Sequence, residues 1–202
     1  MIALQLKDPL DIGGLEEVCA PIMDQLAHKV FASYVMVDKV YVYRSLVGRQ
    51  TEQISWLWHF DNHPREILKV MIYLTDVNEH SAPFEYLRHS TSLKPILGSP
   101  LAPLYGQSRV SREVFRRYES RGYEVCKVTG PRGTTIVFGS NVVHRAVLAR
   151  EIYRDVLTFQ VRPVTFMMRP YVDRRWTGSF QHASFTLDPA DVRPMTEDEL
   201  GL

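Results

Sequence analysis

Residues 34–47 read YVMVDKVYVYRSLV, a run dominated by β-branched and aromatic side chains with polar ones interspersed. This composition is typical of β-strands, because such side chains pack well on a pleated, half-buried surface. We interpret the run as two strands, residues 34–38 and 40–47. Similar runs, separated by polar or Pro-containing turns, predict further strands at residues 53–61, 67–74, 84–87, 123–129, 134–138 and 153–162. About eight short strands in one chain indicate a mainly β fold.

Helical spacing appears in two places. Within residues 14–34, apolar residues recur every three to four positions, which predicts an amphipathic helix packed on the outside of one sheet. Pro21 either begins this helix in its first turn or kinks it. Ser111 is a suitable N-cap for a second helix that runs to about Arg121, with Gly122 as its stop.

Together these elements predict a double-stranded β-helix, the jelly roll found in cupins, with flanking N-terminal and mid-chain helices. The length of 202 residues fits one domain, so we assign residues 1–202 to a single jelly-roll domain. Such a barrel has an interior wide enough for a metal and one small molecule. Residues 93–107 contain three prolines and two glycines, which predicts a loop that we expect to close over the mouth as a lid.

The bulk composition narrows the class of protein. An apolar content of 45% and a charged content of 23% are ordinary for a globular domain, and the net charge of +1 gives no reason to expect nucleic acid or a membrane as a partner. Cys19 and Cys126 lie far apart, so we expect no disulfide framework and a reducing compartment. Because no signal-peptide pattern or membrane-spanning run is found, we expect a cytoplasmic location.

The most chemically specific feature is the segment WHFD at residues 58–61 together with His144. Side chains two apart on a strand share one face, so His59 and Asp61 should converge. His144 follows the predicted strand 134–138 and could reach the same barrel mouth. Two imidazoles and one carboxylate form the set that holds non-haem Fe(II) with open positions for small ligands. An isolated His-x-Asp is more often a hydrogen-bonded surface pair, but the apolar flanks and the second histidine favour a metal site.

Three motifs, in this order, resemble the phytanoyl-CoA dioxygenase family, a branch of the Fe(II)- and 2-oxoglutarate-dependent oxygenases. They are HFD at residues 59–61, IYLTDV at residues 72–77, and GTTIVF at residues 133–138 leading to His144. Each motif is short, but their order and spacing are fairly specific, and the resemblance spans roughly residues 40–163.

This resemblance implies that His59, Asp61 and His144 are the catalytic centre and the Fe(II) ligands. It also implies that Arg154 anchors the distal carboxylate of 2-oxoglutarate, which suits a guanidinium because it can pair with a carboxylate through two hydrogen bonds. The sequence departs from the family pattern at Ala146, where a hydroxyl-bearing residue often contacts 2-oxoglutarate.

Arg145 and Arg150 are the alternatives to Arg154 for this role. Arg145 adjoins His144 and should point away from the metal, and Arg150 falls in a turn. Arg154 begins an otherwise apolar strand, where a charge needs a partner.

Three further residues are weaker candidates. His63 continues the alternation of the HFD segment and could contact the substrate, although an exposed loop histidine is the commoner case. Arg88 follows a predicted strand on the mouth side and could meet an anionic substrate or remain solvated. Lys69 could touch 2-oxoglutarate, but we expect it to face solvent between the sheets.

The sequence therefore predicts an Fe(II)/2-oxoglutarate-dependent dioxygenase that hydroxylates a small molecule and converts 2-oxoglutarate and O2 to succinate and CO2. Asp61 as a third protein ligand argues against halogenation, because a halide would need that position. One alternative is a cupin-like metalloenzyme without 2-oxoglutarate, in which Arg154 binds the substrate itself. Another is a jelly-roll binding module that keeps a metal site without turnover.

Overall fold

The computed structural model describes residues 2–4, 13–47, 57–61, 66–88 and 109–172. The strands in these ranges are β1 (Ile2–Leu4), β2 (Tyr34–Ser45), β3 (Leu68–Tyr73), β4 (Phe84–Leu87), β5 (Val125–Val128), β6 (Thr135–Gly139), β7 (His144–Arg145) and β8 (Arg154–Val164). The helices are α1 (Leu15–Leu26), which continues into a π-helical turn (Ala27–Phe31), and α2 (Arg112–Ser120).

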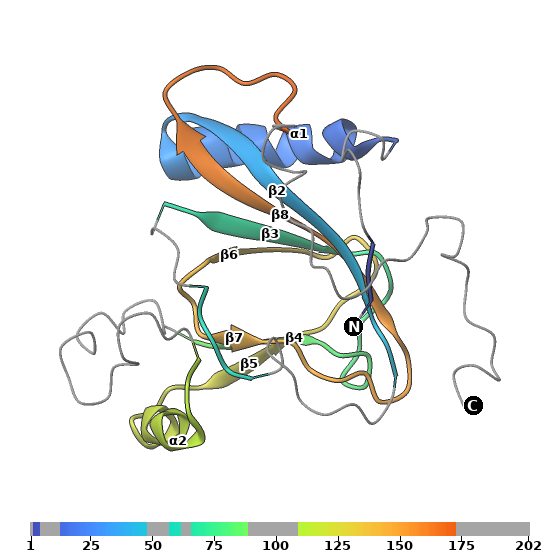
Figure 1. Cartoon of the computed structure of the whole chain (residues 1–202), viewed down its shortest axis with the longest axis vertical. Coiled ribbons are helices and arrows are strands. Elements are labelled where there is room, and N and C mark those ends of the chain that lie inside the picture. Colours follow the sequence, from blue (N-terminus) through green and yellow to red (C-terminus); the bar gives the residue numbers. More distant parts are fainter. Residues whose placement is uncertain (1, 5–12, 48–56, 62–65, 89–108, 173–202) are drawn as a thin grey trace.

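These strands form two antiparallel sheets that face each other, with α1 outside one sheet and α2 outside the other (Figure 1). The larger sheet has the strand order β1-β2-β8-β3-β6, and the smaller sheet has the order β5-β4-β7. The predicted mainly β jelly roll with two flanking helices is confirmed. No helix within the described ranges is long and apolar enough to cross a membrane.

Helix α1 covers the outer face of the larger sheet. Its buried side chains pack on outward-facing residues of β2, β3 and β8 to form the main apolar core: Leu15, Cys19, Met23 and Leu26 against Val35, Val37, Val40, Val70, Ile72, Leu157, Phe159 and Val161. The helix begins at Leu15 and runs through Pro21, so it does not begin at the proline. Helix α2 agrees with its prediction, because the Ser111 hydroxyl accepts a hydrogen bond from the Val114 N–H and Gly122 follows with φ +82°.

Strand β2 is continuous where two strands were predicted, and a β-bulge marks the predicted break. Its register with β8 shifts between Val37 and Lys39, which leaves Asp38 as an extra residue. Before the bulge Val37 faces α1, and after it Val40 does, so the bulge reverses which alternate residues face outward. The Asp38 carboxylate pairs with Arg162 of β8 at 3.4 Å.

The alternate residues of the larger sheet face the space between the sheets. Lys69, Met71 and Tyr73 of β3 lie opposite Gln160, Thr158 and Val156 of β8, respectively. Directly opposed residues in antiparallel strands project to the same face, so these side chains form the wall of the interior.

Further sequence predictions differ from the structure, and others concern residues that it does not describe. The described part of the predicted strand 53–61 makes only isolated bridges, in which His59 pairs with His144 and Arg109. His144 lies in the short strand β7, which was not predicted. The loop 93–107, residue His63 and residues beyond 172 lie outside the described ranges.

Candidate metal centre

His59, Asp61 and His144 come together between the two sheets, with one potential ligand atom of each within 4.8 Å of the others. The Asp61 Oδ1 atom is 4.0 Å from His59 Nε2, and Asp61 Oδ2 is 3.8 Å from His144 Nε2. All three side chains are at least 85% buried, since their exposed fractions are 10%, 15% and 8%. The three residues singled out in the sequence therefore converge.

Backbone hydrogen bonds hold this arrangement. The His59 N–H donates to the His144 carbonyl at 3.0 Å, and the His144 N–H donates to the His59 carbonyl at 2.8 Å. This mutual pairing sets the two imidazole rings side by side, with centroids 4.3 Å apart. The Asp61 N–H donates to the Ser140 carbonyl at 2.9 Å, which fixes the carboxylate beside the rings.

The hydrogen bonds of the imidazole rings define which nitrogen is free to bind a metal. His59 Nδ1 lies 2.8 Å from the Leu57 carbonyl oxygen, and His144 Nδ1 lies 2.8 Å from the Val142 carbonyl oxygen. A carbonyl oxygen only accepts, so each Nδ1 carries the proton and each Nε2 keeps its lone pair. Both lone pairs belong to the nitrogens nearest Asp61, and a metal-binding histidine is held in the same way.

The protonation states suit a divalent cation. Burial, followed by the proximity of His59, lowers the pKa of His144 to about 3, and burial also lowers the pKa of His59. Burial alone would raise the pKa of Asp61, but nearby positive charge, chiefly that of Lys69, outweighs it and keeps this pKa below its usual value. Two neutral imidazoles and one carboxylate are thus present at neutral pH, and this donor set fits Fe(II).

Lys69 also belongs to this site. It was expected to face solvent between the sheets, and it does lie between them, but it is buried against Asp61 and not solvated. Its Nζ atom lies 2.8 Å from Asp61 Oδ2, and only 16% of its side chain is exposed. The strand pattern contained the signal, because Lys69 alternates with Val70 and Ile72, which pack beneath α1. A lysine on the opposite face of such a strand must point between the sheets.

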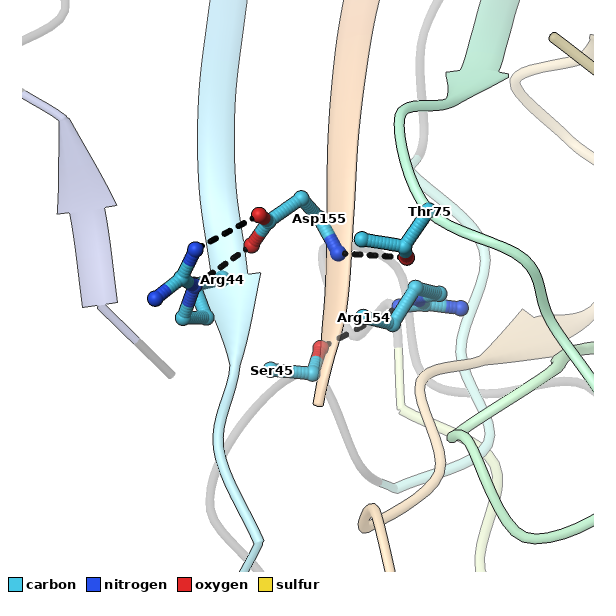
Figure 2. A network of polar contacts seen from close by, with 5 residues as sticks. All are labelled: Arg44, Ser45, Thr75, Arg154 and Asp155. Atoms are coloured by element: carbon cyan, nitrogen blue, oxygen red, sulfur yellow. Dashed lines mark hydrogen bonds and ion pairs between the residues drawn. The ribbon is translucent and has the colours of Figure 1, made fainter. Parts of the chain in front are cut away.

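Arg154 is the second notable feature of the interior. It is 1% exposed, and its Nη2 atom donates a hydrogen bond to the Ser45 hydroxyl at 3.3 Å (Figure 2). Among the described residues, its Nε and Nη1 atoms have no hydrogen-bond partner, and no carboxylate forms an ion pair with it. A buried guanidinium in this condition is costly unless an anion binds it.

A short series of contacts links Arg154 to the metal centre. The guanidinium carbon lies 5.9 Å from the centroid of the Tyr73 ring, and the Tyr73 hydroxyl accepts a hydrogen bond from the Phe84 N–H at 3.0 Å. The Phe84 ring in turn lies 5.5 Å from the ring of His144. Tyr73 and Lys69 share one face of β3, and their Cα atoms are about 13 Å apart. The guanidinium and the triad thus belong to one continuous interior.

Two polar side chains that were not singled out in the sequence also face this interior. Thr158 and Gln160 are 4% and 2% exposed, and neither Thr158 Oγ1 nor Gln160 Oε1 has a hydrogen-bond partner within the described part of the chain. Both alternate along β8 with apolar core residues, and this alternation was visible in the sequence.

The competing arginines are placed elsewhere. Arg145 binds Glu85 through a 2.8 Å hydrogen bond and lies over the Trp58 ring, so it has partners of its own. Arg150 is exposed in a turn. Arg88, a weaker substrate candidate, is 53% exposed and pairs with Glu124 at 3.1 Å, which is the solvated alternative.

Comparison with solved structures returns non-haem iron enzymes. The non-heme alpha ketoglutarate dependent epimerase SnoN from nogalamycin biosynthesis is 16% identical over 73% of this chain and 57% of its own, with a TM-score of 0.55. The carbocyclase SnoK from the same biosynthesis is 17% identical with the same coverage and TM-score. EctD from S. alaskensis with bound Fe is 17% identical over 81% of this chain and 61% of its own, with a TM-score of 0.51.

At these identities the likeness shows the fold. This chain covers 57% to 61% of the length of those three structures. SnoN has also been solved in complex with Fe3+, alpha ketoglutarate and nogalamycin RO, and EctD with 2-oxoglutarate and 5-hydroxyectoine. No protein-family model matches the sequence, and no curated protein matches it.

Proposed function

We propose that this protein is an Fe(II)- and 2-oxoglutarate-dependent dioxygenase that hydroxylates a small molecule. The observation that carries the proposal is the presence, in one interior, of two neutral imidazoles and one carboxylate together with a buried guanidinium that has no anionic partner among the described residues. The first feature suits a divalent metal and the second suits a dicarboxylate that reaches toward it. The jelly-roll fold, which is shared with the iron enzymes named above, is consistent with both.

The chain supplies ligands, orientation and enclosure. His59, Asp61 and His144 would hold the metal through the two Nε2 atoms and a carboxylate oxygen. Arg154 would hold the far carboxylate of 2-oxoglutarate, with Ser45 orienting the guanidinium. When bound, the iron and 2-oxoglutarate supply the oxidising chemistry, in which O2 and 2-oxoglutarate are consumed and succinate and CO2 are released.

Several parts of the interior would exclude water from the reaction. The rings of Phe84 and Phe138 lie against His144, with centroids 5.5 Å and 5.3 Å from its own. Polar interactions are stronger in such a dehydrated space, so the hold of Arg154 on a carboxylate would be firm. Asp61 as a protein ligand favours hydroxylation over halogenation, and the resemblance to the phytanoyl-CoA dioxygenase family supports the same assignment.

The test is an anaerobic titration of Fe(II)-loaded protein with 2-oxoglutarate, followed by visible spectroscopy. We expect a weak charge-transfer band that appears only when Fe(II) and 2-oxoglutarate are both bound. We also expect release of succinate when O2 and a substrate are added. A band that never appears, although the protein binds Fe(II), would favour the cupin-like metalloenzyme in which Arg154 binds the substrate itself. Iron binding without turnover of any substrate in a metabolite screen would favour the binding module.

The Arg154→Ala variant tests the cosubstrate site. Loss of one partner of a buried charged pair costs about 3–5 kcal/mol, so affinity for 2-oxoglutarate should fall by about two to three orders of magnitude. Lysine should rescue binding only partly, because an ammonium cannot form the two-pronged pair. Iron binding should survive. Arg145→Ala and Arg150→Ala are the controls, and a large loss in either, with a mild effect at Arg154, would contradict the assignment.

A further inference from the structure

Lys69 places a positive charge on the carboxylate of the metal centre. Its side chain leaves β3 toward the space between the sheets, and its Nζ atom lies 2.8 Å from Asp61 Oδ2. The exposed fractions of the two side chains are 16% and 15%, so water screens this ion pair much less than a surface pair. A lysine so placed is a third kind of group in the site, distinct from the two imidazoles and the carboxylate.

The position of Lys69 is fixed by the sheet. Lys69 lies opposite Phe138 of β6 on one side and Gln160 of β8 on the other, so its backbone is paired on both edges. Its ammonium contacts the Asp61 carboxylate directly, and that carboxylate lies 4.0 Å from His59 Nε2 and 3.8 Å from His144 Nε2. Strand pairing therefore holds the Lys69 ammonium in place beside the triad.

This arrangement puts one carboxylate between two positive charges whenever a metal binds. The Asp61 carboxylate can neutralise only part of the charge of a divalent cation, and here it already faces an ammonium. Two like charges in a space with little water repel each other appreciably. Without a metal the same ammonium offsets the charge of a carboxylate that would otherwise be buried alone.

We propose that Lys69 is a resident counter-ion of the triad: it stabilises Asp61 in the metal-free protein and weakens the affinity of the site for a divalent metal. The inference rests on the proposed metal centre and adds to it a residue that sets how tightly the metal is held. Lys69 is a positioning residue, because it acts through Asp61.

The experiment is calorimetric titration of metal-free protein with Mn(II), and separately with Co(II), in the absence of 2-oxoglutarate. Lys69→Met removes the charge and keeps most of the side-chain volume, and we expect it to bind either metal about tenfold more tightly than the unaltered protein, or better. Lys69→Arg keeps the charge and should remain close to the unaltered protein. Lys127→Met is the matched control, because Lys127 also pairs with a carboxylate, Glu79, at 2.6 Å, but on the surface.

A second measurement follows thermal unfolding with and without Mn(II). The metal-free Lys69→Met protein should melt at a lower temperature than the unaltered protein, because Asp61 has lost its counter-ion. Saturating Mn(II) should raise its melting temperature by a larger increment than it raises that of the unaltered protein. If Lys69→Met does not fold without metal, Lys69→Gln is titrated in its place and the same increase in affinity is expected.

The outcomes separate this inference from the proposed function. If the unaltered protein binds Mn(II) or Co(II) and Asp61→Ala does not, the metal centre stands. Equal or weaker binding by both neutral variants then overturns the counter-ion inference alone. If the unaltered protein binds neither metal nor Fe(II), the proposed function fails and the inference fails with it.

Discussion

The two faces of β8 are equally buried and serve different purposes. On the face toward α1, Leu157, Phe159 and Val161 pack in an apolar core. On the face toward the smaller sheet, Arg154, Thr158 and Gln160 carry buried polar atoms that lack hydrogen-bond partners within the described ranges. Buried polar groups without partners are rare because each destabilises the fold. The outer face contributes to the stability of the fold, and the unpartnered polar atoms of the inner face are what the proposed cosubstrate site would use.

Two arginines show the same contrast at close range. Arg44 on the outer face donates two hydrogen bonds of 2.7 Å to the Asp155 carboxylate, whereas Arg154, one residue before Asp155, points the opposite way, donates a hydrogen bond to the Ser45 hydroxyl and lies over the Tyr73 ring (Figure 2). The outer guanidinium therefore finds its anion within the chain. The inner one has no carboxylate partner within the described ranges, which is why we propose that it binds the cosubstrate.

The largest expected effect concerns the metal-binding triad, which lies in the interior that the inner face of β8 lines. Alanine in place of His59, Asp61 or His144 should each abolish tight Fe(II) binding and leave the fold largely intact, because the α1 core does not depend on these residues. Anaerobic calorimetric titration and circular dichroism are the measurements. His80→Ala is the control, since His80 pairs with Glu151 on the surface. Unchanged iron affinity in any one triad variant would remove that residue from the site.

The next effect compares the two faces directly through stability. Phe159→Ala should lower the free energy of unfolding by about 3–5 kcal/mol, because it opens a cavity in the α1 core. Arg154→Met should instead raise it by about 1 kcal/mol or more, because an unpaired buried charge is replaced by an apolar chain of similar length. Urea unfolding of the metal-free proteins measures both. The contrast between the faces is refuted if Arg154→Met is as destabilising as Phe159→Ala.

The sequence predicted this contrast only in part. The mainly β jelly roll and the positions of most strands followed from short β-branched runs, and the triad followed from HFD at residues 59–61 and from His144. Local patterns could not show that His59 pairs with His144 through isolated backbone bridges, because that pairing joins segments far apart in the chain.

Side-chain direction was harder to predict than strand position. Lys69 was expected to face solvent because lysine is rarely buried without a partner, and its partner lies eight residues away in a segment that is not a regular strand. Among the described residues, Thr158 Oγ1 and Gln160 Oε1 have no hydrogen-bond partner, and this could be recognised only once the positions of the neighbouring strands were known. Whether such a polar side chain is buried or exposed depends on the partners that it meets in the folded chain, and residue type alone does not determine it.

A smaller effect is the response of the inner face to acid. The native protein keeps His144 neutral down to its pKa of about 3, whereas the unfolded chain protonates this residue near the ordinary value of 6.5. The unfolded state therefore binds more protons between these values, so this contribution is fully present above pH 6.5 and is lost as the pH falls toward 3. His59 acts in the same direction, because burial lowers its pKa too.

Unfolding free energies of the metal-free protein from pH 7 to pH 5 should fall by up to about 1.4 kcal/mol per pH unit for each such histidine. His144→Asn removes one titrating group and should flatten the dependence. An identical slope in the variant would mean that His144 does not remain neutral in the native protein.

The smallest effect belongs to the outer arginine. Arg44 and Asp155 are 18% and 22% exposed, so their pair is partly shielded from water, slightly less than the pair of Lys69 and Asp61. Arg44→Met should lower the free energy of unfolding by about 1 kcal/mol or less and leave the affinity for 2-oxoglutarate unchanged. Chemical denaturation and the cosubstrate titration check the two parts. A loss of cosubstrate affinity comparable to that of Arg154→Ala would erase the distinction between the two arginines.

The β-bulge in β2 contains one residue, Asp38, that the pairing of β2 with β8 does not need. Val37 pairs with Val161 and Lys39 with Gln160, so deletion of Asp38 would join two halves that are already in consecutive register with β8. A single-codon deletion there would keep the apolar residues of both halves facing α1 and would remove one inward carboxylate. One charge can therefore be removed from this face of the sheet, or added to it, by loss or gain of a single residue while the pairing of the strands stays the same.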